Sequence, residues 1–170
     1  MTAIAPYKHP DKFFIDGKWV APSSASKIDV INCSTEELFL SVAEAQQADV
    51  NRAVDAARKA FDRGPWPRMK HKERADYLRK IATAIQTLAE ALSKVWVSEA
   101  GITLPIAQYN SATLHEVYNY YAGLADTFKF EEERQPAPFS GNVGMITREP
   151  VGVVTAIIPW NAPSSLIACI

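Results

Sequence analysis

The sequence predicts an α/β protein in which an N-terminal hairpin and a helical layer precede the first strand of a parallel sheet. Three observations support this fold class. An Asp-Gly pair stands between apolar residues near the N-terminus, as in tight hairpins. Three later segments repeat apolar residues at spacings of three and four, which indicates helices. A continuous apolar and β-branched run over residues 151–158 then indicates a strand that is buried on both faces.

The composition is that of an ordinary globular domain. The chain has 170 residues, of which 48% are hydrophobic, and a net charge of −1. Charges of both signs are interspersed, so we expect no binding of nucleic acid. No apolar run is long enough to cross a membrane, and residues 1–12 lack the apolar core of a signal peptide. The two cysteines and three histidines have no metal-binding or redox spacing, so we expect a reduced, cytoplasmic protein without a metal site.

The first expected element is a hairpin over residues 13–20. Its Asp16-Gly17 pair supplies the positive φ angles that a type I′ turn requires. A further short strand is expected at residues 28–31, after a polar loop. Cys33 follows at a turn with no basic partner near it in the sequence, so we interpret it as structural.

Three helices are predicted next, at residues 48–61, about 68–100 and about 106–128. The pattern of the second allows a break near residues 89–91, and Gly101 ends it. The positions of this helix that are expected to be buried are Leu78, Ile81, Ile85, Leu88 and Leu92. Those of the third are Leu114, Val117, Tyr121 and Leu124.

The remaining chain leads from these helices to the parallel strand. Residues 131–138 are acidic with two prolines and are interpreted as a solvent-exposed connection, whereas residues 143–149 are expected to be extended. Pro159 ends the strand because it cannot donate to a sheet ladder, and Pro163 suits the first turn of a helix. Ligands of open parallel sheets bind beyond the carboxyl end of such a strand, where Asn161 stands.

Residues 149–163 read Glu-Pro-Val-Gly-Val-Val-Thr-Ala-Ile-Ile-Pro-Trp-Asn-Ala-Pro. This stretch resembles the signature that opens the cofactor-binding domain of NAD(P)-dependent aldehyde dehydrogenases, including the rare Pro-Trp-Asn-x-Pro turn. Phe-Ile-x-Gly-x-Trp at residues 14–19 is similar to the hairpin with which these enzymes begin. Members of the family are considerably longer, so the chain resembles their N-terminal portion, which ends with the first strand of a Rossmann-like parallel sheet.

The resemblance implies that the chain consists of three parts. Residues 1–130 would be the hairpin and the helical part of the cofactor-binding domain. Residues 131–149 would be a connection and a strand toward the oligomerisation element, with residues 143–149 at a subunit contact. Residues 150–170 would be the first strand of the dinucleotide-binding sheet and the start of the helix that follows it. The resemblance also implies a homo-oligomer (dimer or tetramer), NAD or NADP as cofactor, and an aldehyde substrate that is oxidised to a carboxylic acid.

Asn161 is the principal candidate for catalysis. From the residue alone, a helix N-cap is the alternative, because Asn favours that position. The family's motif places an oxyanion-stabilising Asn here, so the resemblance implies that Asn161 donates to the oxygen of a Cys thiohemiacetal. It also implies that Asn161 and the residues before it contact the cofactor. For the residues before Asn161, packing at the end of the strand is an equally good explanation. These preceding residues are Ile157, Ile158, Pro159 and Trp160.

Other parts of the family's reaction match no residue of this chain, namely the nucleophilic Cys, the general-base Glu and the cofactor-binding Lys. Cys169 lies in an apolar stretch without an adjacent base, so it is not expected to replace the nucleophile. Glu99 falls where some members carry an acidic residue near a structural cation, but a surface carboxylate near a helix end is the favoured interpretation. We therefore expect the chain alone to be inactive. The alternatives are a non-catalytic helical module that binds a protein partner, and a different enzyme that uses Cys169.

Overall fold

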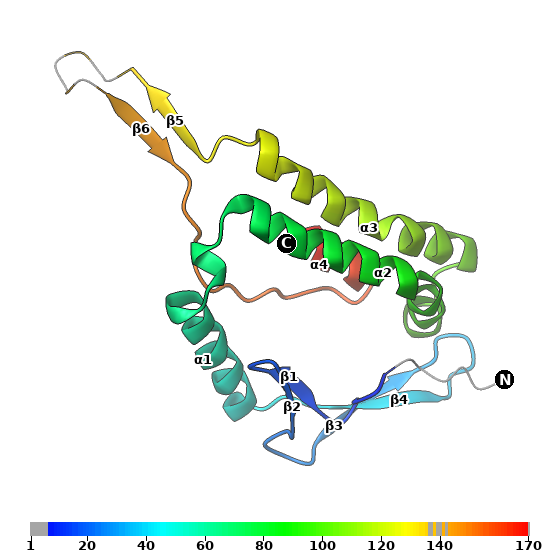
Figure 1. Cartoon of the computed structure of the whole chain (residues 1–170). Helices are drawn as coiled ribbons and strands as arrows, with labels where there is room; N and C mark the ends of the chain where they lie inside the picture. The colour runs from blue at the N-terminus through cyan, green and yellow to red at the C-terminus, as the bar shows by residue number, and fades with distance from the viewer. Residues whose placement is uncertain (1–6, 136–137, 139–140, 142, 170) are drawn as a thin grey trace.

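The computed structural model of the chain describes residues 7–135, 138, 141 and 143–169. Residues 1–6 of the expected N-terminal part and residues 136–137 of the expected connection therefore lie outside the described residues. Two long helices lie side by side and form the largest layer, and strand pairs and a shorter helix border them (Figure 1). The predicted α/β class is confirmed.

The N-terminal hairpin is formed as predicted. Strands β1 (Phe13–Ile15) and β2 (Lys18–Val20) pair in antiparallel orientation. Asp16 and Gly17 connect them with φ angles of 52° and 73°, the positive values that a type I′ turn requires.

A second antiparallel pair follows the hairpin. The predicted strand at residues 28–31 is confirmed as β3 (Lys27–Ile31), and it pairs with β4 (Leu38–Ala43), which the sequence did not lead us to expect. Asn32 begins the turn between the two strands, and its side-chain oxygen accepts a hydrogen bond from the backbone N–H of Ser34 at 2.8 Å.

Helix α1 (Gln47–Arg63) confirms the first predicted helix, and the buried carboxylate of Asp49 ties it to the loop after β2. This side chain is 2% exposed. It accepts hydrogen bonds from the Ser23 hydroxyl (2.7 Å), the Ser23 N–H (2.9 Å) and the Gln46 N–H (3.0 Å), and it pairs with Arg52 (2.6 Å). These contacts, the bond from the Ser23 hydroxyl foremost, lower the pKa of Asp49 to about 2.

Helix α2 (His71–Ala100) follows a short 3-10 turn, η1 (Trp66–Arg68), and runs without interruption. The break considered near residues 89–91 is absent because alanine, which occupies two of these positions, is the strongest helix former. Gly101 ends the helix as predicted, with a φ of 68° and an N–H bond to the Val97 carbonyl at 3.0 Å.

Helix α3 (Leu104–Thr127) returns alongside α2, and small side chains allow the two to approach closely. Leu114 is buried as predicted, but Ile81, Leu88 and Tyr121 are 41%, 51% and 45% exposed, so their predicted burial is wrong for this chain. The most buried residues of the two helices are Ala75, Ala82, Ser93, Ala107, Ser111, Leu114 and Ala122. Alanine and serine at the contact leave larger apolar side chains on the flanks of the pair.

A third hairpin projects from the helices (Figure 1). Strands β5 (Glu131–Arg134) and β6 (Gly144–Thr147) pair in antiparallel orientation. The expected extended segment at 143–149 is confirmed, because it contains β6. The interpretation of 131–138 as a connection without secondary structure is wrong for residues 131–134, which form β5. Cross-strand hydrogen bonds and an ion pair from Glu132 to Arg148 at 2.7 Å hold this acidic segment as a strand.

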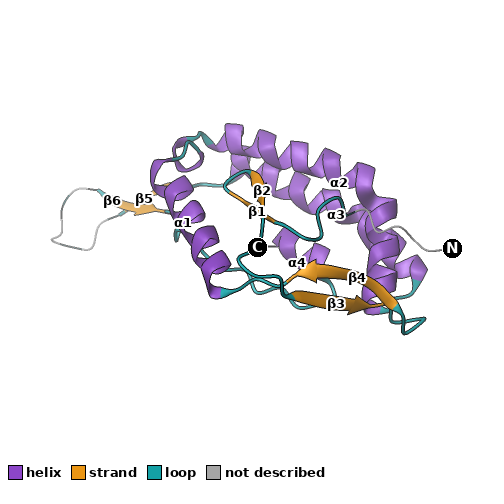
Figure 2. Cartoon of the chain, turned by 90° about the horizontal axis from the view of Figure 1, so that it is seen from below, coloured by secondary structure: helices purple, strands orange, loops and turns teal. Residues whose placement is uncertain are grey.

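The segment between β6 and α4 (Pro163–Cys169) contains no strand, so the one predicted at 151–158 is not formed in the part of the chain that the structure describes. Its side chains are not buried: Val151 is 95% exposed and Ile157 88%. A parallel strand requires hydrogen bonds from its neighbours, and no described segment lies in register with it. The helix expected after Pro163 is confirmed as α4, which contacts α3 (Figure 2).

No helix among the described residues combines the length and the hydropathy that crossing a lipid bilayer would require.

Candidate active-site turn

The candidate site is a tight turn at residues 159–162, directly before α4. Because α4 begins at Pro163, the position that caps its N-terminus belongs to Ala162. The Ala162 carbonyl accepts the first helical hydrogen bond, from the Leu166 N–H at 3.2 Å. Asn161 therefore lies one residue before the cap, and the interpretation of Asn161 as an N-cap is not supported.

Asn161 is exposed, and among the described residues only its backbone forms a hydrogen bond to another element. Its carbonyl oxygen accepts a hydrogen bond from the Trp96 indole Nε1–H, across 2.8 Å, although the two residues are 65 positions apart. Within residues 7–135 and 143–169, its side-chain amide bonds to no protein group. An exposed carboxamide N–H of this kind is chemically a neutral hydrogen-bond donor.

Trp160 makes a second indole hydrogen bond between this turn and α2. Its Nε1–H donates to the carbonyl of Glu99, in the last turn of α2, at 3.2 Å. Cys33 also contacts this last turn of α2: its thiol donates to the same carbonyl at 2.8 Å, and its N–H donates to the Ser98 carbonyl at 3.0 Å. Carbonyls at the end of a helix have no partner within it, so these three donors satisfy groups that α2 leaves open. The structural interpretation of Cys33 agrees with these contacts.

The Glu99 side chain points to the N-terminal segment. Its carboxylate accepts a hydrogen bond from the Tyr7 hydroxyl at 3.1 Å. Partial burial raises the pKa of Glu99, although the bond from Tyr7 opposes this shift. Partial burial, with the nearby carboxylate, also raises the pKa of Tyr7. No group of three potential metal ligands occurs among the described residues.

The residues that were expected to contact a cofactor form an apolar strip beside Asn161. Ile157 is 88% exposed and Trp160 58%, Pro159 is exposed, and Ile158 is half-buried. Exposed apolar side chains of this kind can pack against the rings of a dinucleotide. The strip carries no charged or hydroxyl group to hold the phosphates, so it fits as one wall of such a site and not as a whole site.

Cys169 is not brought to this turn. It ends α4, whose seven residues separate it from Asn161 by roughly 10 Å along the helix axis. The thiol is exposed. Partial burial raises the pKa of Tyr118, and the nearby Cys169 adds to this shift.

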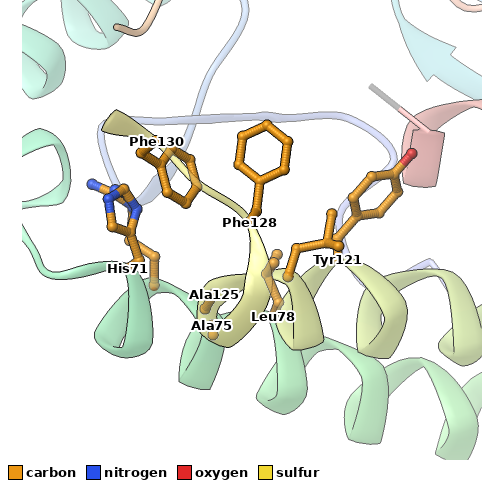
Figure 3. A pocket seen from close by; sticks show the side chains of 9 residues that line it. His71, Ala75, Leu78, Tyr121, Ala125, Phe128 and Phe130 are labelled. Carbon is orange, nitrogen blue, oxygen red and sulfur yellow. The ribbon is translucent and has the colours of Figure 1, made fainter. Parts of the chain in front are cut away.

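A separate pocket of about 270 Å³ lies at the other end of the α2–α3 pair (Figure 3). The His71 ring stacks on Phe130 with centroids 3.6 Å apart, and Arg74 bonds to its Nδ1 at 2.7 Å. One face of the His71 ring and its Nδ1 therefore already have partners. His71 is 25 positions before Trp96 on one helix, so roughly 37 Å separates this pocket from the Asn161 turn. The other residues that line it are Ala75, Leu78, Tyr121, Leu124, Ala125 and Phe128.

Trp96 is the main residue of the site that the sequence analysis missed. A half-buried Trp in the last turns of an amphipathic helix resembles any core aromatic, and its partner is distant in sequence. The only available signal was that an indole N–H usually finds an acceptor when it is buried.

Comparison with known proteins identifies the fold. The model of the aldehyde dehydrogenase family matches residues 19–169. Geranial dehydrogenase of Castellaniella defragrans is 40% identical over 154 residues, which are 90% of this chain and 32% of that protein. Betaine aldehyde dehydrogenase of Bacillus subtilis is 36% identical, over 88% of this chain and 30% of its own length.

Solved structures of aldehyde dehydrogenases have a similar fold over this part of the chain. Betaine aldehyde dehydrogenase from Staphylococcus aureus in complex with NAD+ superimposes with a TM-score of 0.85 and 35% identity, over 93% of this chain and 31% of that one. Mycobacterium tuberculosis aldehyde dehydrogenase complexed with NAD+ gives a TM-score of 0.84 and 36% identity, over 93% and 32%.

The hairpins, the helical layer and the turn before α4 thus define the N-terminal part of an α/β dehydrogenase fold. The resemblance noted in the sequence is confirmed. The chain belongs to the aldehyde dehydrogenase family. It spans about a third of the length of the curated relatives that it matches.

Proposed function

We propose that residues 1–170 are the N-terminal part of a subunit that oxidises an aldehyde to a carboxylic acid with NAD or NADP. Family membership supports the reaction class, and solved relatives in complex with NAD+ support the cofactor. When bound, the dinucleotide supplies a hydride acceptor. The strip from Ile157 to Trp160 forms one apolar wall beside it.

Asn161 has the catalytic role in this proposal. A cysteine elsewhere in the subunit attacks the aldehyde carbonyl, and the oxygen of the resulting thiohemiacetal gains negative charge. The Asn161 amide N–H donates a hydrogen bond to that oxygen. The observation that carries the proposal is that this amide is exposed and bonds to no described group, while the backbone of the same residue is fixed by Trp96. Such a donor requires little reorganisation when the charge develops.

The experiment is a steady-state comparison of Asn161→Ala with the wild type in a complete subunit, with NADH formation as the signal. Removal of one oxyanion donor should lower kcat by about 10²-fold. The KM for NAD+ should change much less, because the lost interaction forms in the transition state. Asn51→Ala, on the exposed face of α1, is the matched control and should leave kcat unchanged. A normal kcat for Asn161→Ala would remove this residue from the mechanism.

The 170-residue chain alone should form no NADH from an aldehyde. The roles of nucleophile and general base have no counterpart at the described turn, and Cys169 stands at the far end of α4. NADH production by the pure chain would contradict the proposal and favour an enzyme that uses its own cysteine. The two cysteines, which form no disulfide, suit a reducing compartment, so we retain the cytoplasm as the proposed location.

The projecting β5–β6 hairpin is the proposed subunit contact. An isolated two-stranded hairpin is marginally stable in water, and this one exposes apolar side chains on β6 and just before it. Val143 is 68% exposed, Met145 57% and Ile146 42%. A second copy of the subunit that covers this hairpin would bury them, which supports a homo-oligomer, as a dimer or tetramer.

A further inference from the structure

Two indole N–H groups connect the last turns of α2 with the turn that carries Asn161. Trp96, on α2, donates to the carbonyl of Asn161, and Trp160, on the turn, donates to the carbonyl of Glu99 on α2. The two bonds run in opposite directions between the same two elements. Movement of the turn away from α2 would therefore stretch both bonds.

The turn has few other means of support. Residues 151–158 before it contain no strand or helix among the described residues, and their side chains are largely exposed. After it, α4 is seven residues long and contacts α3. The bond from Trp96 is also the shorter of the two indole bonds, at 2.8 Å against 3.2 Å.

The acceptor in this bond is the peptide group of Asn161 itself. A hydrogen bond to its carbonyl oxygen fixes the plane of the peptide between Asn161 and Ala162, and so restricts rotation about the Cα–C bond of Asn161. The side chain branches from the same Cα, so its direction depends on that rotation. A donor that must meet a developing oxyanion within a few tenths of an ångström depends on such restraint.

We propose that Trp96 is a positioning residue for the oxidation reaction, which holds the Asn161 amide in its donating orientation through the hydrogen bond to the Asn161 carbonyl. This inference rests on the proposed function, since it assigns Asn161 the role of oxyanion donor. Trp96 touches neither substrate nor cofactor in this account and acts only through Asn161.

The test is a double-mutant cycle in a complete subunit, with Trp96→Phe, Asn161→Ala and the variant that combines them. Trp96→Phe removes the N–H and keeps an aromatic ring. A neutral hydrogen bond of this kind corresponds to about a 5-fold change in rate, so kcat should fall about 5-fold in the wild-type background. The KM for aldehyde and for NAD+ should stay within about 2-fold. In the Asn161→Ala background, Trp96→Phe should have no further effect on kcat.

Trp66→Phe is the matched control. The Trp66 ring packs edge-on against Tyr77, with centroids 5.7 Å apart, and its N–H meets no acceptor among the described residues. This variant should leave kcat unchanged in both backgrounds. Incorporation of benzothienylalanine at position 96 replaces only the N–H with sulfur, so it preserves the ring volume and repeats the test if Trp96→Phe does not fold.

Each outcome bears on a distinct claim. An unchanged kcat for both position-96 variants, or an equal loss with and without Asn161, would overturn the positioning role while the donor role of Asn161 stands. If Asn161→Ala itself has normal kcat, the donor role fails, and the positioning role fails with it. A 5-fold loss that disappears in the Asn161→Ala background supports both.

Discussion

Replacement of Gly101 by Ala should destabilise the protein at the end of helix α2. Gly101 has a φ of 68°, in the left-handed region, where an L-residue with a Cβ costs about 1–2 kcal/mol. The new Cβ would lie 3.4 Å from the Cβ of Cys33, an ordinary contact that adds little. The expected loss is therefore about 1–2 kcal/mol of unfolding free energy, or a fall of roughly 2–8 °C in the thermal unfolding midpoint.

Gly123→Ala is the control with the opposite expected sign. Gly123 lies inside α3, and a Cβ added there meets no atom within 4 Å. Alanine in a helix interior is favoured over glycine by about 0.5–1 kcal/mol, so this variant should unfold at a higher temperature. Circular dichroism of the two variants and the wild type measures both shifts. A Gly101→Ala midpoint equal to or above that of the wild type would refute the account of how α2 ends.

Three further predictions concern other parts of the fold. The pKa of Asp49 is about 2 when folded and near 3.8 ordinarily, so its contribution to stability is complete above about pH 4 and is lost as the pH falls toward 2. Urea unfolding of Asp49→Asn should therefore differ most from the wild type near neutral pH, and a difference that grows in acid would contradict this. Gly64→Ala should lower the unfolding free energy by about 1–3 kcal/mol, because the added Cβ would overlap the Ala60 carbonyl. An unchanged midpoint in urea would contradict this and show that the end of α1 relaxes freely. Met145→Glu should dissociate the complete enzyme into smaller species by light scattering, and an unchanged mass would place the subunit contact elsewhere.

Local signals in the sequence predicted the elements that are determined locally. The Asp16-Gly17 turn, the end of α2 at Gly101 and the helix after Pro163 all follow from backbone preferences of a few residues. The three long helices follow from apolar periodicity. The packing of α2 against α3 could not be predicted from this periodicity. Their contact buries alanine and serine, whereas the periodicity is read from large apolar side chains.

Elements that depend on a partner could not be predicted from local signals. Glu131–Arg134 has no preference for a strand and becomes one only through its pairing with β6. Conversely, residues 151–158 have a strong preference for a strand and form none, because no described neighbour pairs with them. β-structure is decided by cross-strand contacts, which single segments do not encode.

Some features of the candidate site could likewise be predicted from the sequence, and others could not. The motif at residues 149–163 placed Asn161 and the apolar residues before it, and its family assignment is confirmed. The bond from Trp96 to Asn161 joins residues 65 positions apart, so only the fold shows it. The position of Cys169 at the far end of α4 also needed the structure.

The intact mass of the protein, purified from its natural source, tests the central claim that this chain acts as the N-terminal part of a dehydrogenase subunit. Since the chain covers 32% of geranial dehydrogenase, the account predicts a subunit about three times heavier than the 18.8 kDa of these 170 residues. Such a subunit has room for the nucleophile and the general base that complete the site of Asn161. A mass of 18.8 kDa would contradict the account, and the catalytic role of Asn161 would then fail for this protein.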